Sequence, residues 1–398
     1  MKNTVISYKE CSGCEACVDK CPKGCIEIKQ NDEGFFFPVI DILHCVSCNV
    51  CRKVCPQKKT PKFHSEPKEV WIAWALDDKI RKSSSSGGVY SVFANYVLKQ
   101  GGFANGVKFD SSFLLRQHLW SHPQDIIQSR GSKYVQCCPN GIYRKVQSAL
   151  KSGKTVFFTS TPCQVAGLYA FLEKEYENLF TCDFVCHGVP SPDFFQKYCR
   201  DMSTMFDKEI KRVEFRVLNG WGICTQLFFD KKKIMYGKND YYTTSFLNGL
   251  NYRESCYNCY YAKSTRVADI TIGDFWGINR KWMIKNNAFS GISLLQVNSA
   301  QGQKLFELVR NQLWLERRSI EEAIQGNKQL QSPVARPDMR SFFYKDFQTL
   351  SKNDFIAKYK SRATGTSKLK RLIRLPFKYF FMLLGVCINK AIRNAENN

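Results

Sequence analysis

Eight cysteines near the start of the sequence have the types and spacing of iron–sulfur ligands. The pattern C-x2-C-x2-C-x3-C-P occurs at residues 11–22 and again at residues 45–56. In proteins that hold two 4Fe–4S clusters with this spacing, three cysteines of one run bind one cluster and the fourth binds the other. The first predicted ligand set is Cys11, Cys14, Cys17 and Cys55, and the second is Cys45, Cys48, Cys51 and Cys21.

Zinc is the alternative metal, because zinc ribbons also use pairs of cysteines spaced C-x2-C. Zinc needs only four ligands in two pairs, so the third closely spaced cysteine of each run is surplus to a zinc site. A proline after each run, Pro22 and Pro56, turns the chain away from a short helix. Residues 1–58 are therefore predicted to be a small ferredoxin-like domain with two clusters. Cys25 has no place in the pattern and is read as an ordinary small apolar residue.

Four later cysteines form a third candidate set, which is assembled from distant segments. Cys256 and Cys259 are a C-x2-C pair, whereas Cys163 and Cys186 are solitary. The two solitary cysteines each follow a predicted strand, and the carboxyl edge of a sheet is where α/β folds place their ligand sites. By spacing alone, the four thiols suit a third 4Fe–4S cluster, a structural zinc ion or no metal.

A serine and glycine run, RKSSSSGG at residues 81–88, stands before a predicted helix. Such a run exposes backbone N–H groups and hydroxyls to an anion, and two basic residues stand beside it. Serine and glycine are also common in helix caps and turns, so the run by itself leaves phosphate binding and a plain structural role open.

Strands and helices alternate after the cysteine-rich segment, which predicts an α+β or α/β multidomain protein. Strands are expected at residues 71–76, 103–109, 114–120, 155–160, 180–185 and 267–272, helices at 89–99 and 165–172, and a turn at 161–164. The predicted divisions are a ferredoxin domain at 1–58, a linker at 59–69, a mixed α/β flavin domain in two parts at 70–150 and 151–335, and a basic helical extension at 336–398.

Composition limits the class of protein. The 398 residues are 44% hydrophobic and 14% aromatic, which excludes a disordered or fibrous chain. There are 19 cysteines but no apolar segment of the signal-peptide kind at the start, so we expect cytoplasmic thiols that bind metal. The longest uncharged apolar run, residues 379–388, is too short to span a bilayer.

The formal net charge of +24 is unevenly distributed. Residues 1–58 hold eight Lys and Arg against seven Asp and Glu, so the basic character belongs to the rest of the chain. Residues 362–398 hold eight basic residues and one acid, which suits either an amphipathic helix on the anionic inner face of the membrane or a solvated helix packed on its own domain. No nucleic-acid motif is present, and nucleic acid is not an expected partner.

Six motifs in one order resemble the family of coenzyme F420 hydrogenase/dehydrogenase beta subunits, with a bacterial-type ferredoxin domain in front. The motifs are RKSSSSGG at 81–88, RGSKYVQ at 130–136, TSTPCQVAGL at 159–168, CHGVPSP at 186–192, CYNC at 256–259 and DITIGDFWGI at 269–278. Members of this family look like flavoproteins that hold FAD beside a 4Fe–4S cluster and exchange a hydride with coenzyme F420.

The resemblance assigns roles to the residues of these motifs. It implies that Ser85, Ser86, Gly87 and Gly88 approach the flavin phosphates, that Gly131, Ser132 and Lys133 lie near the cofactor, and that Cys163, Cys186, Cys256 and Cys259 hold the third cluster. A flavin converts between two-electron hydride transfer and one-electron cluster chemistry. Electrons would then pass through the three clusters to a redox partner such as a ferredoxin, or in reverse. No catalytic acid or base is assigned.

Other functions remain open beside this iron–sulfur oxidoreductase. The chain can instead be a non-catalytic electron-transfer subunit of a reductase. Four consecutive serines resemble the bacterial branch found with surface-polysaccharide genes, where a membrane-associated accessory role is the alternative. The substrate does not follow from the fold, so F420 is one candidate hydride carrier among several.

Overall fold

The computed structural model describes residues 3–58, 62–216, 223–230, 233–236 and 240–360. The chain forms two compact units, Met1–Leu350 and Ser351–Asn398. In the second unit the described residues form helix α14 (Lys352–Lys360). The predicted basic tail at residues 362–398 lies outside the described residues.

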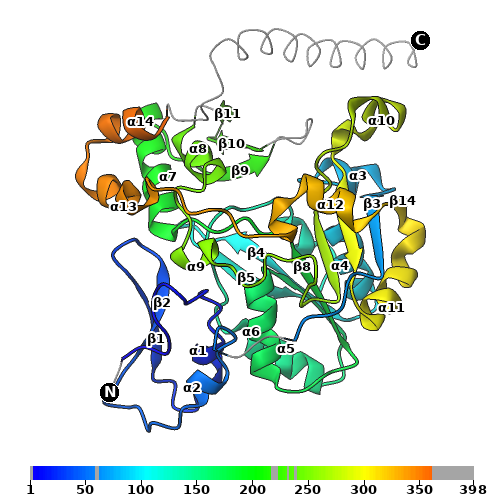
Figure 1. Ribbon diagram of the computed structural model, residues 1–398, viewed down its shortest axis with the longest axis horizontal. Helices are drawn as coiled ribbons and strands as arrows, with labels where there is room; N and C mark the ends of the chain where they lie inside the picture. The colour runs from blue at the N-terminus through cyan, green and yellow to red at the C-terminus, as the bar shows by residue number, and fades with distance from the viewer. Residues whose placement is uncertain (1–2, 59–61, 217–222, 231–232, 237–239, 361–398) are drawn as a thin grey trace. The chain divides into compact units, whose positions relative to one another are not determined.

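A nine-stranded mixed sheet is the centre of the first unit (Figure 1). Its middle strands, β12, β8, β7 and β4, run parallel, and antiparallel strands flank them on both sides. The strand order is β14 (Leu313–Arg317), β3 (Glu69–Ala75), β13 (Ser293–Val297), β12 (Ile270–Asp274), β8 (Leu179–Phe184), β7 (Val156–Ser160), β4 (Phe103–Phe109), β5 (Leu115–Trp120) and β6 (Cys137–Cys138).

Helices cover both faces of this sheet, as the run of apolar residues in β7 requires for a strand buried on two sides. Phe157 packs on the face of α4 (Val89–Lys99) and α11 (Ala300–Val309). Its neighbours Val156 and Phe158 pack on the opposite face, against α5 (Ile142–Lys151) and α6 (Pro162–Leu172). The predicted mixed α/β architecture is thereby confirmed.

The ferredoxin-like segment shares its core with α5 and α6, because its buried cysteines and Val54 belong to the same hydrophobic cluster as those helices. It consists of α1 (Ala16–Lys20), the antiparallel pair β1 (Ile26–Gln30) and β2 (Phe36–Ile40), and α2 (Val50–Lys53). In Figure 1 it lies directly beside α5 and α6.

A second, three-stranded antiparallel sheet was not expected from the sequence. It has the order β11 (Lys233–Tyr236), β10 (Ile223–Phe228) and β9 (Arg212–Arg216). Aromatic rings join the helices beside it: Phe194 lies 5.2 Å from Tyr242 and 4.9 Å from Phe347, between ring centroids. These rings belong to α7 (Pro192–Phe206), α8 (Tyr241–Leu247) and α13 (Arg340–Thr349).

Several local predictions agree with the structure residue for residue, including the helix at 89–99 and the strand at 103–109. The turn predicted at 161–164 is wrong: α6 begins at Pro162. Proline suits the first turn of a helix, where its missing N–H group has no partner to lose. Cys163 therefore lies in the first turn of α6. The remaining short helices are α3 (Asp78–Lys82), α9 (Glu254–Tyr257), α10 (Arg280–Lys285) and α12 (Ile320–Gly326).

Within the described segments, no helix has both the length and the apolar character needed to cross a membrane.

Candidate functional site

The first cysteine set lines one small pocket in the ferredoxin-like segment. Cys11, Cys14, Cys17 and Cys55 all contribute to its wall, and each is at most 8% exposed. Apolar residues such as Val5 close the rest of this wall. Four buried thiols around one pocket fit the ligand demand of a 4Fe–4S cluster.

Burial sets the protonation of these ligands. It raises the pKa of Cys55, and the neighbouring Cys11 raises it further. Because metal ligands must be thiolates, cluster binding has to displace the protons that burial favours. Burial also raises the pKa of the adjacent Glu15 to about 8, so that its carboxyl group is mainly uncharged at neutral pH.

The second cysteine set lies nearer the surface than the first. Cys21 is buried, Cys45 and Cys51 are half-buried, and Cys48 is exposed. Burial raises the pKa of Cys51, and the charges of Cys21 and Cys48 raise it further. All eighteen cysteines in the described segments are free thiols.

Cys25 is close to the second set although the spacing gave it no role. Its Sγ lies 3.5 Å from the Sγ of Cys21. Burial raises the pKa of Cys25 to about 11, with further contributions from Cys21 and Cys45. The sequence contained one usable signal, since Cys25 is four residues after a predicted ligand.

The third cysteine set is brought together from three separate segments. Cys163 lies in the first turn of α6, Cys186 follows β8, Cys256 lies in α9 and Cys259 follows α9. Burial raises the pKa of Cys186, and then Cys256, Cys163 and Cys259 raise it further in that order. All four predicted ligands are therefore within electrostatic reach of one another. In the part of the chain that the structure describes, no group of three or more His, Cys, Asp or Glu side chains is spaced to hold a single metal ion.

The first and third sets meet across helix α6. Gly167 is one turn after Cys163, and a Cβ atom at Gly167 would lie 3.2 Å from the Sγ of Cys14. The hydroxyl of Tyr143 supports this contact, because its one hydrogen is shared between the carbonyl oxygens of Cys14 at 2.7 Å and Gln164 at 3.0 Å. Tyr143 belongs to none of the six motifs, whereas Gly167 lies in the motif at residues 159–168, where no role was assigned to it.

The two predicted flavin motifs also come together. The Oγ of Ser85 accepts a hydrogen bond of 2.7 Å from the backbone N–H of Ser132. Gly131, with φ of +86°, turns the chain at this point. The Nζ of Lys133 donates to three backbone carbonyls of the same loop, including that of Gly131 at 3.0 Å. Burial lowers the pKa of Lys133 to about 8.

Three residues of the serine and glycine run, Ser86, Gly87 and Gly88, have structural roles. The hydroxyl of Ser86 donates to the carbonyl of Ile292 at 2.8 Å. A Cβ at Gly87 would lie 2.4 Å from the carbonyl oxygen of Ala73, so this glycine is required where the run crosses β3. Gly88, with φ of +84°, caps α4. Ser85 and the facing loop with Ser132 and Lys133 are therefore the better placed candidates for contact with a phosphate.

A buried ion pair lies behind the Ser85 loop. Arg216 donates to the carboxylate of Asp274 at 2.8 Å, to the hydroxyl of Tyr134 at 3.3 Å and to the carbonyl of Ser85 at 3.0 Å. The Nε of Arg216 is buried and has no hydrogen-bond partner. Asp274 belongs to the motif at residues 269–278. An unsatisfied N–H group and a cationic side chain behind two polar loops fit an anionic cofactor.

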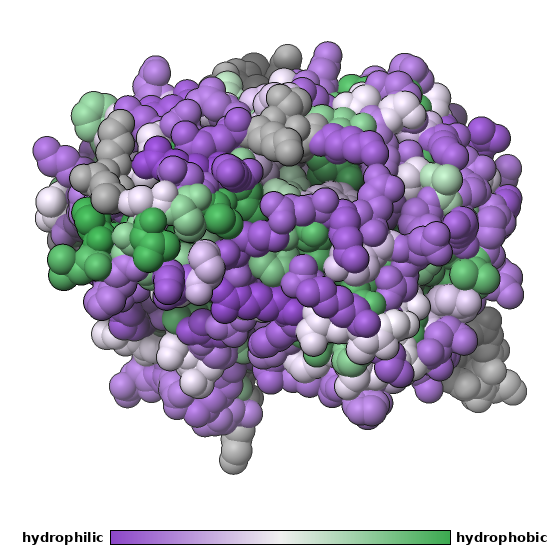
Figure 2. All heavy atoms as spheres, turned by 90° about the horizontal axis from the view of Figure 1, so that it is seen from below, coloured by the Kyte–Doolittle hydropathy of each residue, from purple (hydrophilic) through white to green (hydrophobic). Residues whose placement is uncertain are grey.

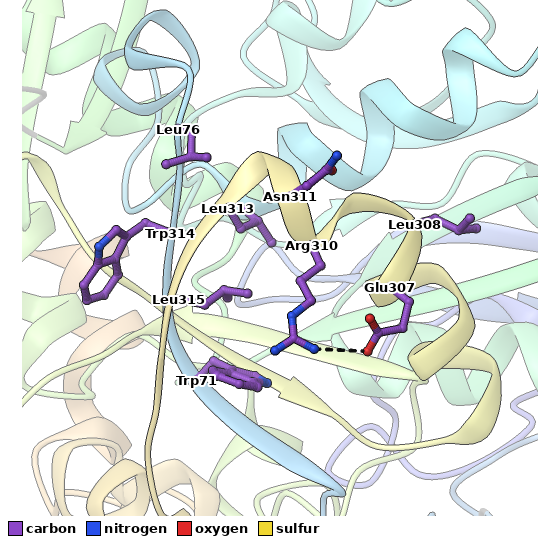
Figure 3. A pocket seen from close by; sticks show the side chains of 9 residues that line it. All are labelled: Trp71, Leu76, Glu307, Leu308, Arg310, Asn311, Leu313, Trp314 and Leu315. Carbon is purple, nitrogen blue, oxygen red and sulfur yellow. Dashed lines mark hydrogen bonds and ion pairs between the residues drawn. The ribbon is translucent and has the colours of Figure 1, made fainter.

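A larger hollow of about 690 Å³ lies beside the edge strand β14 (Figure 3). Trp71, Trp314 and Leu308 contribute to its lining, and Arg310 forms an ion pair of 3.5 Å with Glu307 at its rim. None of the predicted site residues lines this hollow, so the candidate site is at the cysteine sets and the Ser85 loop.

Three segments of the chain match known protein families. Residues 10–59 match the 4Fe-4S dicluster domain. Residues 70–141 and 153–323 match the N-terminal and C-terminal parts of the coenzyme F420 hydrogenase/dehydrogenase beta subunit, which together are well over half of the chain.

Two relatives and one solved structure are similar to the chain. A subunit of the F420H2 dehydrogenase of Methanosarcina mazei is 22% identical over 320 residues, 78% of this chain and 85% of that protein. Coenzyme F420-dependent sulfite reductase of Methanocaldococcus jannaschii is 21% identical over 173 residues, 42% of this chain but only 26% of the reductase. A structure of the F420-reducing NiFe hydrogenase complex from Methanosarcina barkeri aligns with a TM-score of 0.47 at 16% identity, over 73% of this chain and 95% of that chain. The motifs and both matched parts agree, and the chain belongs to the family of coenzyme F420 hydrogenase/dehydrogenase beta subunits, with a 4Fe-4S dicluster domain at its N-terminal end.

Proposed function

We propose that this protein is an iron–sulfur flavoprotein oxidoreductase that links a hydride carrier, such as F420, to a one-electron redox partner. The observation that carries the proposal is the meeting of the first and third cysteine sets across α6, where the Cβ position of Gly167 lies 3.2 Å from the Sγ of Cys14. Cys163 of the third set also adds to the raised pKa of Cys14 in the first, so the two sets are within electrostatic reach of each other. Clusters held by these sets would therefore lie near one another, as a path for electrons needs.

The first and second cysteine sets would each hold a 4Fe–4S cluster, and Cys163, Cys186, Cys256 and Cys259 would hold a third. FAD would lie at the Ser85 loop, near Ser132 and Lys133, with Arg216 behind it. A bound flavin supplies the conversion between a hydride and single electrons. The protein contributes buried thiols, N–H donors and cationic side chains, and we assign no residue as a proton donor.

The surface at the second cysteine set suits contact with the redox partner. Cys48 is exposed, and the apolar residues Leu43 and Val46 beside it are 93% and 57% exposed. Figure 2, which views the molecule from below, shows hydrophobic side chains gathered at the side where Figure 1 places this segment. A ferredoxin-type protein could dock there, with its own cofactor close to the second cluster.

Cofactor analysis tests the proposal directly. Anaerobically purified protein should contain about twelve irons and one FAD per chain, from three four-iron clusters and one flavin. About eight irons without flavin would contradict it, and would leave the ferredoxin-like segment as the only redox part.

A second candidate is an electron-transfer subunit without a substrate site of its own. The name of the Methanosarcina mazei relative, a dehydrogenase subunit, favours this candidate. Stopped-flow reduction of the purified protein by reduced F420, and in parallel by NADH, distinguishes the two. Hydride uptake by the isolated chain supports the first, and cluster reduction only in the presence of a partner subunit supports the second.

A further inference from the structure

Arg253 is buried without a carboxylate partner, unlike the other fully enclosed arginines of the described chain. Arg253, Arg266 and Arg340 are the three arginines that are almost completely inaccessible to solvent. Arg266 pairs with Asp183 at 3.0 Å, and Arg340 pairs with Glu33 at 2.7 Å. Among the ion pairs of the described residues, none includes Arg253.

The contacts of Arg253 are neutral. Its Nε donates to the carbonyl of Cys11 at 2.6 Å, and its Nη1 donates to the carbonyl of Phe36 at 2.9 Å. Its Nη2 is buried and has no hydrogen-bond partner. A guanidinium in protein remains charged, and a buried charge is costly unless an opposite charge balances it.

The neighbouring acid does not supply that balance. Glu254 is directed to other arginines, with its carboxylate 2.8 Å from Arg336 and 3.6 Å from Arg340. Glu15 is also within electrostatic reach of Arg253, but among the described residues no ion pair or hydrogen bond joins these two side chains. Cys163 and Cys256 of the third cysteine set are within the same reach, so thiolates are the remaining anionic groups near Arg253.

Two cysteine sets are adjacent to this guanidinium. Cys11, whose carbonyl it holds, belongs to the first set, and Cys256 of the third set is three residues further along the chain. The backbone reinforces the second link, because the N–H of Cys256 donates to the carbonyl of Arg253 at 2.9 Å. None of the contacts described for Arg253 involves the second set.

We propose that Arg253 is a positioning residue whose charge is balanced by the thiolate-bound clusters of the first and third cysteine sets, and that it raises the reduction potentials of both. This inference rests on the proposed function, in which both sets hold 4Fe–4S clusters. Reduction adds one negative charge to a cluster, so a nearby buried cation stabilises the reduced state more than the oxidised state. The second cluster serves as an internal reference.

The test is an EPR-monitored redox titration of the anaerobic holoprotein and its variants. Arg253→Gln should shift the potentials of the first and third clusters to more negative values and leave the second unchanged. Arg253→Lys retains the charge and should keep all three potentials near those of the wild type. Ser255→Ala is the matched control, because the Oγ of Ser255 donates to the same carbonyl of Cys11 at 3.0 Å without carrying a charge.

The outcomes separate this inference from the proposed function. A wild-type protein with fewer than about twelve irons contradicts the proposed function itself. If Arg253→Gln binds all its clusters and their reduction potentials are unchanged, only the role of Arg253 is overturned. The same holds if Arg253→Lys shifts these potentials as much as Arg253→Gln does. If Arg253→Gln binds no clusters, Arg253→Lys and Ser255→Ala decide. Unchanged reduction potentials in both variants support the role of the charge of Arg253, and a shift to more negative potentials in either variant overturns it.

Discussion

A Cβ atom on Gly167 would stand 3.2 Å from the sulfur of Cys14, so the backbone of one residue packs directly against the thiol of the other. Gly167 shares helix α6 with Cys163, and Cys14 belongs to the ferredoxin-like segment. The missing side chain of one glycine therefore allows a ligand of the first set to pack beside the helix that supplies a ligand of the third. Distances between clusters depend on such contacts, because side-chain bulk between two sites would separate them.

Gly167→Ala should reduce cluster loading. The added methyl would lie 3.2 Å from the Sγ of Cys14 and 2.9 Å from the hydroxyl of Tyr143, which is tighter than ordinary contact. Alanine is favoured over glycine inside a helix by about 1 kcal/mol, so a loss cannot come from helix propensity. We expect about four irons fewer per chain by iron analysis. Gly101→Ala is the control, because Gly101 has a positive φ but no atom within 4 Å of the added Cβ, and this variant should keep its full iron content. A full iron content in Gly167→Ala would contradict the importance of the contact with Cys14.

Asp274→Asn should destabilise the protein. The carboxylate of Asp274 is 2.8 Å from Arg216, and the side chains are only 14% and 4% exposed. Removing one charge of a buried pair typically costs about 3–5 kcal/mol, because the other charge remains buried alone. Urea unfolding of the holoprotein measures the loss. Glu307→Gln removes an exposed pair with Arg310 and should change the free energy of unfolding by less than about 1 kcal/mol. If Asp274→Asn and Glu307→Gln lower the free energy of unfolding equally, burial of the ion pair does not determine the cost.

Binding of FAD should weaken as the pH rises through about 8. Burial lowers the pKa of Lys133 to about 8, so its ammonium group loses its proton near that pH, whereas an unfolded lysine keeps its proton to much higher pH. Below pH 8 the buried charge of Lys133 therefore lowers the stability of the folded state, and this unfavourable contribution disappears as the pH rises above 8. Over the same pH range, a bound anionic ligand loses its interaction with the ammonium group. Fluorescence titration with FAD from pH 6.5 to 9.5 measures the effect. Lys133→Met should bind more weakly and show a flat profile; a pH dependence equal to that of the wild type would exclude Lys133.

Cys25→Ser should leave the iron content unchanged. The Sγ of Cys25 lies 3.5 Å from that of Cys21, but the spacing assigns the ligand role to Cys21. Cys21→Ser should accordingly lower the content by about four irons. Iron analysis and EPR of both variants decide the assignment, and a selective loss in Cys25→Ser would make Cys25 the ligand.

Local parts of this structure could be predicted because the signals are local. The helix at 89–99 follows from apolar periodicity bounded by glycines, and the strand at 103–109 begins directly after Gly102. The meeting of Ser85 with Ser132 was available only through the resemblance, since no periodicity connects the two loops.

The rest depends on pairings between distant segments. The bond from Arg253 to the carbonyl of Cys11 joins residues 242 positions apart, and arginine has no spacing rule for such a partner. The order of the nine strands also depends on long connections, as β3 pairs with both β13 and β14 from the far end of the unit. The cysteine sets leave a pattern in the sequence, whereas the buried Arg253 lies outside all six motifs.

Leu43→Asp should slow electron transfer to a ferredoxin-type partner without changing iron or flavin content. Leu43 is 93% exposed beside the second cysteine set, and an aspartate at this position would bury an unpaired charge in the interface, which is costly. A loss of about 1.4 kcal/mol would reduce kcat/KM for the partner about tenfold. Steady-state reduction of a clostridial-type ferredoxin by the holoprotein measures it. Leu308→Asp is the control, since Leu308 is 51% exposed at the hollow beside β14. If the two variants lose the same rate, or neither does, the partner docks elsewhere.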